Sequence, residues 1–166
     1  MTDFGALYSR HAPEVFRFAL HLTGDRDEAE DITSEAFVRA WASPGPIRAA
    51  TVKGYLYTIA RNLFLQRLRK RRRHVGLEDE LPDPRPGPDA QAEQSSEVDA
   101  ALAGLRRLPE VDRAALVMRA MEDMSYEEIA RALGISLAAV KVRIHRARRA
   151  LLAMRDAGQT GGRPKP

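Results

Sequence analysis

Residues 124–149 read MSYEEIARALGISLAAVKVRIHRARR and predict two helices joined by a tight turn. Ser125 followed by Glu128 has the spacing of a capping box, which starts a helix. Gly134 stands where that helix must end, because a residue without a Cβ adopts a left-handed turn at little cost. Ser136 can cap the second helix. The stretch therefore predicts a helix-turn-helix within an all-α fold.

The second of these helices is predicted to have one apolar and one cationic face. Apolar side chains recur at helical spacing at Val140, Ile144, Ala147 and Leu151. The opposite face carries the cations Lys141, His145, Arg146, Arg148 and Arg149. Such a face suits DNA phosphates and the acceptor edge of guanine. A solvated basic helix in an ordinary bundle is the alternative, but the agreement of caps, glycine turn and charge favours a helix that reads DNA.

Composition sets the frame around this segment. The chain has 166 residues, which suits one domain or two small ones, and 44% of them are hydrophobic. The net charge is only +4, so clusters of charge matter more than their sum. The absence of cysteine excludes disulfides and thiolate metal sites and fits a reducing cytosol. With no signal peptide and no apolar run of membrane-spanning length, we expect a soluble cytoplasmic protein without membrane insertion or cofactor.

The first part of the chain, residues 1–73, predicts a small helical domain. Pro13 marks the start of a new helix, and the capping-box spacing after Asp25 starts another that runs to about residue 41. A third long helix is expected from about Val52 to Arg73, after a loop rich in proline and glycine.

A linker and a second helical domain follow. Residues 74–96 are acidic and proline-rich and have no hydrophobic period, which predicts a flexible linker. Helical signals return over residues 97–156, where Pro109 suits the first turn of a helix. Residues 157–166 are rich in glycine and proline, and we expect a disordered tail. The sequence thus predicts two small all-α domains joined by a linker.

An acidic segment lies in the first domain. Six acids and one base occur between Asp25 and Glu35. A metal site is disfavoured because helical spacing scatters these carboxylates and no histidine completes a ligand set. A solvated acidic face and a docking face remain, and Phe37 and Trp41, which we expect to be exposed, favour docking.

A basic segment follows on the third helix. Seven bases and no acid occur between Arg61 and Arg73, with Tyr55 and Tyr57 just upstream. A cationic track near aromatic rings suits single-stranded or melting DNA. A solvated arginine run beside two core tyrosines is the alternative.

Three segments carry a resemblance to a known family. Residues 27–41 (DEAEDITSEAFVRAW) resemble the polymerase-docking helix of bacterial sigma-70-family factors. Residues 53–63 (KGYLYTIARNL), with the arginine run after them, resemble the helix that reads and opens the promoter −10 element. The helix-turn-helix resembles the −35-reading domain. The order of the three segments and the short length resemble the extracytoplasmic-function (ECF), or group-four, subgroup.

The resemblance implies a protein that binds core RNA polymerase, through the clamp helices of its largest subunit, and promoter DNA. The implied polymerase-binding residues are Glu30, Asp31, Ile32, Glu35 and Phe37. The implied −10 residues are Lys53, Tyr55, Asn62, Arg67, Arg69, Lys70, Arg71 and Arg72, with Asn62 at a pocket for a flipped base. The implied −35 residues are Lys141, Val142, His145 and Arg146 on base edges, and Arg143, Arg148 and Arg149 on the backbone.

Other classes of function were weighed against this one. A free-standing helix-turn-helix regulator would bind duplex DNA without polymerase, but it has no need of the docking and melting segments. An enzyme is disfavoured, because the four histidines have no partner at a useful spacing and no glycine-rich phosphate loop occurs. The family also implies an anti-sigma factor that hides the DNA and polymerase faces.

Overall fold

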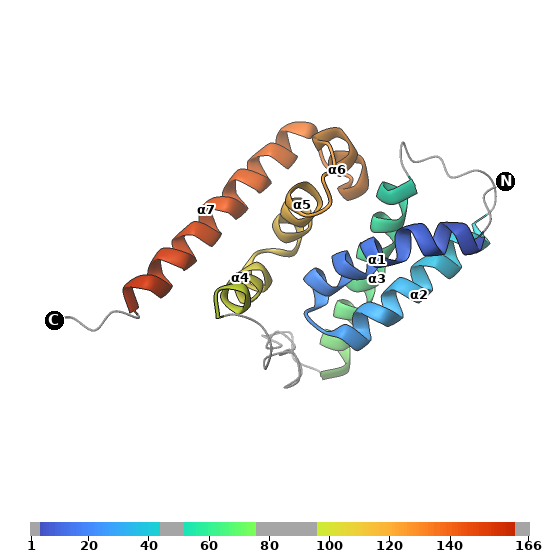
Figure 1. Cartoon of the computed structure of the whole chain (residues 1–166), viewed down its shortest axis with the longest axis horizontal. Coiled ribbons are helices and arrows are strands. Elements are labelled where there is room, and N and C mark those ends of the chain that lie inside the picture. Colours follow the sequence, from blue (N-terminus) through green and yellow to red (C-terminus); the bar gives the residue numbers. More distant parts are fainter. Residues whose placement is uncertain (1–3, 44–51, 76–95, 162–166) are drawn as a thin grey trace.

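The computed structural model describes residues 4–43, 52–75 and 96–161. These residues form helices and turns without a strand, so the all-α prediction is confirmed. The helices are α1 (Phe4–Thr23), α2 (Arg26–Ala42), α3 (Val52–Val75), α4 (Ser96–Arg107), α5 (Glu110–Ala120), α6 (Tyr126–Leu133) and α7 (Leu137–Gly161). Helices α1 to α3 form the N-terminal half and α4 to α7 the C-terminal half (Figure 1).

The N-terminal half is a three-helix bundle whose turns follow from local chemistry. Gly24 links α1 to α2 with a φ of +71°, which costs little only for glycine. Asp25 caps α2 by accepting the backbone N–H groups of Asp27 (2.9 Å) and Glu28 (3.3 Å), as the sequence predicts. In the core, the Phe18 ring stacks on the ring of Tyr57 with their centroids 4.5 Å apart.

The prediction that Pro13 starts a new helix is wrong. Helix α1 continues through Pro13. Proline removes one backbone donor from the helix. Leu7 before it and Val15 and Phe18 after it are buried on the same apolar face, and this packing stabilises α1 as one continuous helix.

The C-terminal half contains the predicted helix-turn-helix. The Ser125 hydroxyl accepts the backbone N–H of Glu128 at 3.1 Å. Gly134 ends α6 in the left-handed region, with a φ of +67°. The Ser136 hydroxyl then accepts the backbone N–H of Ala139 at 3.1 Å, in the first turn of α7. The Ser125 cap, the left-handed turn at Gly134 and the Ser136 cap are therefore confirmed.

The end of α7 differs from the expectation. Helix α7 continues to Gly161, so the tail expected to be disordered from residue 157 is helical over its first residues. Residues 162–166 and most of the predicted linker, residues 76–95, lie outside the described residues. The glycine- and proline-rich composition that suggested a tail begins at residue 157. Residues such as Ala157 and Gln159 are nevertheless compatible with a helix, so α7 continues for another turn.

The two halves pack against each other. Helix α3 contacts α6, and α1 contacts α4 and α5. At the turn after α1, a Cβ added to Gly24 would lie 2.7 Å from Nε of Arg106 on α4, which shows how closely the halves approach. Figure 1 shows α7 running along the outer side of the C-terminal half, away from α1 to α3.

Candidate nucleic-acid interface

Helix α7 presents the cationic face that the sequence predicts. Val140, Ile144 and Ala147 are buried against α5 and α6. The exposed side includes Lys141, Val142, His145, Arg146, Arg148 and Arg149. A shallow groove runs along it, lined by Lys141, Val142, His145, Arg146, Arg149, Ala150 and Ala153. Cations on the rim of an open groove can contact phosphates and base edges together.

A buried carboxylate on α5 anchors two arginines of this face. Asp112 is 1% exposed and accepts hydrogen bonds from Arg143 Nη1 at 2.9 Å and from Arg146 Nε at 3.0 Å and Nη2 at 3.1 Å. Arg146 remains 57% exposed, so its guanidinium is fixed in direction but open to a ligand. The sequence gives Arg143 and Arg146 as DNA contacts but does not identify Asp112.

The protonation of Asp112 follows from these bonds. Burial alone would raise the pKa of Asp112, but hydrogen bonds from Arg146 and Arg143 and their positive charges outweigh it and lower that pKa. The same hydrogen bond and charge raise the pKa of Arg146. The Asp112 carboxylate is therefore ionised near neutral pH and accepts hydrogen bonds from both arginines.

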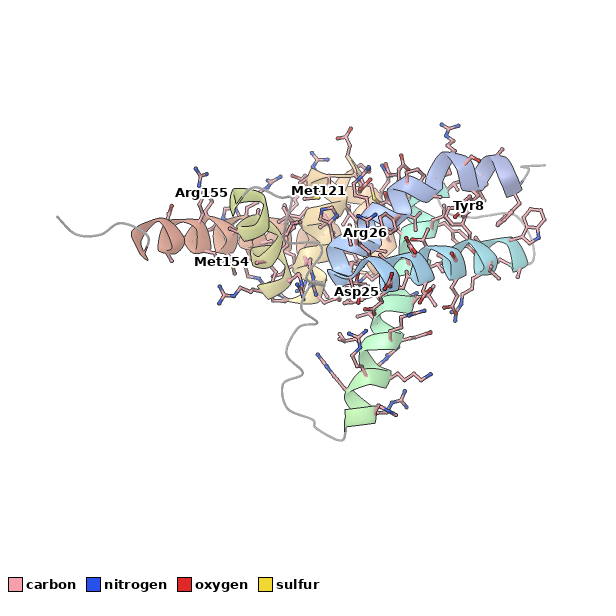
Figure 2. The ribbon with its side chains drawn as sticks, turned by 60° about the horizontal axis from the view of Figure 1, so that its bottom comes forward. Tyr8, Asp25, Arg26, Met121, Met154 and Arg155 are labelled. Carbon is pink, nitrogen blue, oxygen red and sulfur yellow. The ribbon has the colours of Figure 1, made fainter. Side chains whose placement is uncertain are left out.

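Helix α3 presents a second cationic face at its C-terminal end. The final turns of α3 extend away from the other helices (Figure 2). Arg69, Lys70 and Arg72 are exposed there, and Asn62 is exposed near the middle of the helix. Two other cations pair with α2: Arg71 Nη2 lies 2.8 Å from Glu28, and Arg67 Nη2 lies 3.7 Å from Glu35. The four exposed residues, all predicted to bind the −10 element, are therefore accessible. Arg67 and Arg71 lie instead on the side of α3 that faces the acids of α2.

The N-terminal end of α3 is covered instead. Lys53 Nζ donates to the backbone oxygen of Glu122 at 2.5 Å and lies 3.7 Å from its carboxylate. Tyr55 is half-buried against the core, and Tyr57 is fully buried within it. The resemblance assigned Lys53 to promoter DNA, but in this structure Lys53 is bound by the C-terminal half.

The predicted polymerase-binding residues on α2 fall into an exposed group and a buried group. Glu30 and Asp31 are exposed and Glu35 is partly exposed. Ile32 and Phe37 are 0% and 1% exposed, so the expectation of an exposed Phe37 is wrong and neither side chain is available for docking.

The burial of Ile32 follows from the periodicity of the helix. Ile32 falls on the same face as the buried residues Ala29, Ala36 and Ala40, which pack against α1 and α3. The expectation for Trp41 holds, with 60% exposure, and Val38 is 61% exposed beside it. Val38 was missed, although it lies one turn before Trp41 on the face opposite the alanines.

Sequence reasoning also missed a buried acid between the halves. Glu122 follows α5, and its side chain has no exposed surface. Its carboxylate accepts from Arg17 Nε and Nη2 on α1, both at 2.8 Å, and from the Tyr57 hydroxyl at 2.7 Å. Burial and then the bond to Glu122 raise the pKa of Tyr57, which keeps its hydroxyl a donor. No local pattern marks such a group, because its partners lie far away in the chain.

Other kinds of site find no support in the part of the chain that the structure describes. No group of three or more potential metal ligands occurs among those residues. No helix among the same residues is long and apolar enough to cross a membrane.

Comparisons with known proteins match both halves. The family model "Sigma-70 region 2" matches residues 7–74, and "Sigma-70, region 4" matches residues 99–151. The ECF RNA polymerase sigma factor SigE of Mycolicibacterium smegmatis is 39% identical over 158 residues, covering 91% of this chain and 61% of that protein. SigL of Mycobacterium tuberculosis is 37% identical over 168 residues, covering 93% of this chain and 90% of SigL.

Solved structures agree with the sequence matches. The sigma factor RpoE in complex with the anti-sigma factor NepR, from Bartonella quintana, superposes with a TM-score of 0.77 at 27% identity, covering 94% of this chain and 98% of RpoE. CnrH in complex with the cytosolic domain of CnrY gives a TM-score of 0.70 at 26% identity, covering 93% and 88% of the two chains. The chain therefore belongs to the ECF subgroup of the sigma-70 family of RNA polymerase sigma factors.

Proposed function

We propose that this protein binds core RNA polymerase and directs it to a class of promoters, where it reads the −10 and −35 elements and helps to melt the start region. The observation that carries this proposal is the pairing of both family regions with two separate cationic faces, one on α3 and one on α7. The match of region 2 over residues 7–74 also argues against a free-standing regulator, which has no use for a polymerase-docking domain.

The described surfaces support a division of roles. The α7 face reads −35 DNA, with Lys141, His145 and Arg146 towards base edges and Val142 placed to contact a thymine methyl. The exposed side of α3 holds −10 DNA through Asn62, Arg69, Lys70 and Arg72, with Arg67 and Arg71 joining from the side that faces α2. Polymerase docks on the exposed acids of α2, with Trp41 and Val38 as apolar contacts in place of Ile32 and Phe37.

The proposal also covers how the protein is regulated and where it works. The likeness to RpoE and CnrH, both solved with a protein partner, supports an anti-sigma factor that covers the DNA and polymerase faces. A factor of this kind works with polymerase in the cytoplasm and carries out no covalent chemistry of its own. Recovery of polymerase alone from cells, under both resting and inducing conditions, would contradict the anti-sigma proposal.

In vitro transcription tests the main proposal. The purified chain is mixed with sigma-free core polymerase and a pool of upstream DNA from its own genome, and the transcript start sites are mapped. We expect discrete starts that share two spaced motifs. A core polymerase that neither binds the chain nor starts transcription with it would overturn the proposal.

A further inference from the structure

An aromatic ring at the start of α6 contacts cations from two other helices. Tyr126 is the first residue of α6, directly after the Ser125 cap, and it packs partly buried against the core. The guanidinium carbon of Arg119, on α5, lies 4.3 Å from the centroid of the Tyr126 ring. The ammonium nitrogen of Lys141, on α7, lies 5.9 Å from the same centroid. One ring therefore links the end of α5 to the cationic face of α7.

We propose that Tyr126 is a positioning residue for Lys141, whose ammonium group its ring fixes on the face of α7 that binds the −35 element. The proposal rests on the DNA-binding function proposed above. It adds a residue outside α7 that determines how selectively Lys141 contacts DNA.

The Tyr126 ring is itself fixed by Arg119. Arg119 Nη1 donates to the backbone oxygen of Met124 at 3.0 Å, so its guanidinium is tied across the turn between α5 and α6. An aromatic face attracts a cation within about 6 Å, and the separation of 4.3 Å is well inside that range. The Ser125 hydroxyl fixes the backbone beside the ring by accepting the N–H of Glu128 at 3.1 Å. The ring therefore offers a defined place to a second cation.

A ring suits a lysine on a DNA-binding face better than a carboxylate does. A free lysine side chain has many rotamers, and their loss opposes an ordered contact unless the folded chain already restricts them. A carboxylate would restrict Lys141 but would also compete with DNA phosphates for its charge. An aromatic ring carries no net charge, so the charge of Lys141 stays available to DNA. Lys141 is exposed and lines the groove along α7 with His145 and Arg146.

Promoter binding by the full-length chain in complex with core polymerase tests the proposal. Competition among single-base variants of the −35 element measures affinity and base preference for wild type and for Tyr126→Leu and Lys141→Ala, singly and together. We expect Tyr126→Leu to weaken binding about fivefold, which is the range of a cation–π contact. It should relax preference at the same position as Lys141→Ala, and it should cause no further loss when Lys141 is already absent.

Tyr126→Phe is the matched control, because it keeps the ring and removes only the hydroxyl. We expect it to have the affinity and the base preference of wild type. Arg119→Met removes the cation that fixes the ring, and it should relax the same preference as Tyr126→Leu only while Lys141 is present. If Tyr126→Leu does not fold, Arg119→Met with and without Lys141→Ala decides instead.

Nuclear magnetic resonance of the free chain gives a signature that does not depend on DNA. The ring current of an aromatic side chain shifts protons above its face to higher field. We expect the Cε protons of Lys141 at higher field than those of Lys70, which is exposed on α3. The difference should persist in Tyr126→Phe and disappear in Tyr126→Leu. Equal positions for the two lysines in wild type would exclude the proposed contact.

The outcomes separate this inference from the proposed function. An equal loss from Tyr126→Leu with and without Lys141 would overturn the inference, because the ring would then act on the fold or on DNA by itself. A loss in Tyr126→Phe as large as in Tyr126→Leu would also overturn it and assign the hydroxyl to a direct DNA contact. Absence of promoter binding by the wild-type complex would contradict the proposed function, on which the inference rests.

Discussion

Asp112 fixes the direction of two arginines on α7, Arg143 and Arg146. Its carboxylate receives three hydrogen bonds from Arg143 and Arg146 while staying buried. We predict that Asp112→Asn weakens binding of the −35 element by polymerase carrying this protein about tenfold, because a good bidentate contact is worth about 1–3 kcal/mol only when it is well placed. Competition between matched and mutated −35 sequences measures this. An unchanged preference would show that Asp112 serves stability alone.

A substitution of Arg146 distinguishes a base contact from a phosphate contact. If it contacts a base edge, Arg146→Ala weakens binding and relaxes preference at one position of the −35 element. Binding to a panel of single-base promoter variants checks this prediction. A uniform loss across the panel would assign Arg146 to the phosphate backbone.

The lowered pKa of Asp112 also predicts how stability depends on pH. Because the folded pKa lies below the unfolded value of about 3.9, the stabilising effect is complete above that value. It is lost as pH falls through the lower, folded pKa. Urea unfolding of wild type and Asp112→Asn should therefore differ by a constant amount near neutral pH and converge in acid. A difference that grows as pH falls would contradict the assignment.

At the scale of single elements, the turn between α6 and α7 depends on one backbone angle. Gly134 has a φ of +67°, and no atom lies within 4 Å of a Cβ added there, so the cost of substitution is conformational. We predict that Gly134→Ala lowers the free energy of unfolding by about 1 kcal/mol. Gly134→Asn should lose less, because asparagine tolerates the left-handed region. Equal losses in denaturant unfolding would point to a contact rather than to backbone strain.

At the scale of the whole molecule, the interface joins two helical bundles whose buried residues form one cluster. We predict that the full chain unfolds in one transition and that the double variant Glu110→Gln and Glu122→Gln unfolds in two, because removing the three ion pairs of these carboxylates uncouples the halves. Calorimetry of the two proteins makes the comparison. A single transition in both would mean that the other contacts between the halves, such as the cation–π contact of Arg113 with the Phe64 ring, are sufficient for coupling.

The features predictable from the sequence were those encoded locally. The Ser125 and Asp25 caps, the Gly134 turn and the apolar stripe through Val140 and Ile144 depend on neighbours within a few positions, and each is found. The continuity of α1 through Pro13 was missed because tertiary packing overrides a local signal.

The features that were not predictable depend on distant partners. Glu122 meets Arg17 across 105 positions and Tyr57 across 65, and nothing in a local pattern pairs them. The burial of Phe37 needed the placement of α1 and α3 around α2, because a helix with acids on several sides gives little indication of which face turns inward.

The pairing of Glu122 with Arg17 has a consequence for gene dosage. A contact within one chain has a fixed effective concentration, so its occupancy does not change with the number of copies in the cell. An inhibitor protein is different, because it is titrated and releases its target only above a threshold set by stoichiometry. The fraction of chains in which this pair joins the two halves is therefore the same at every level of synthesis, whereas the fraction captured by an inhibitor protein depends on the ratio of the two proteins.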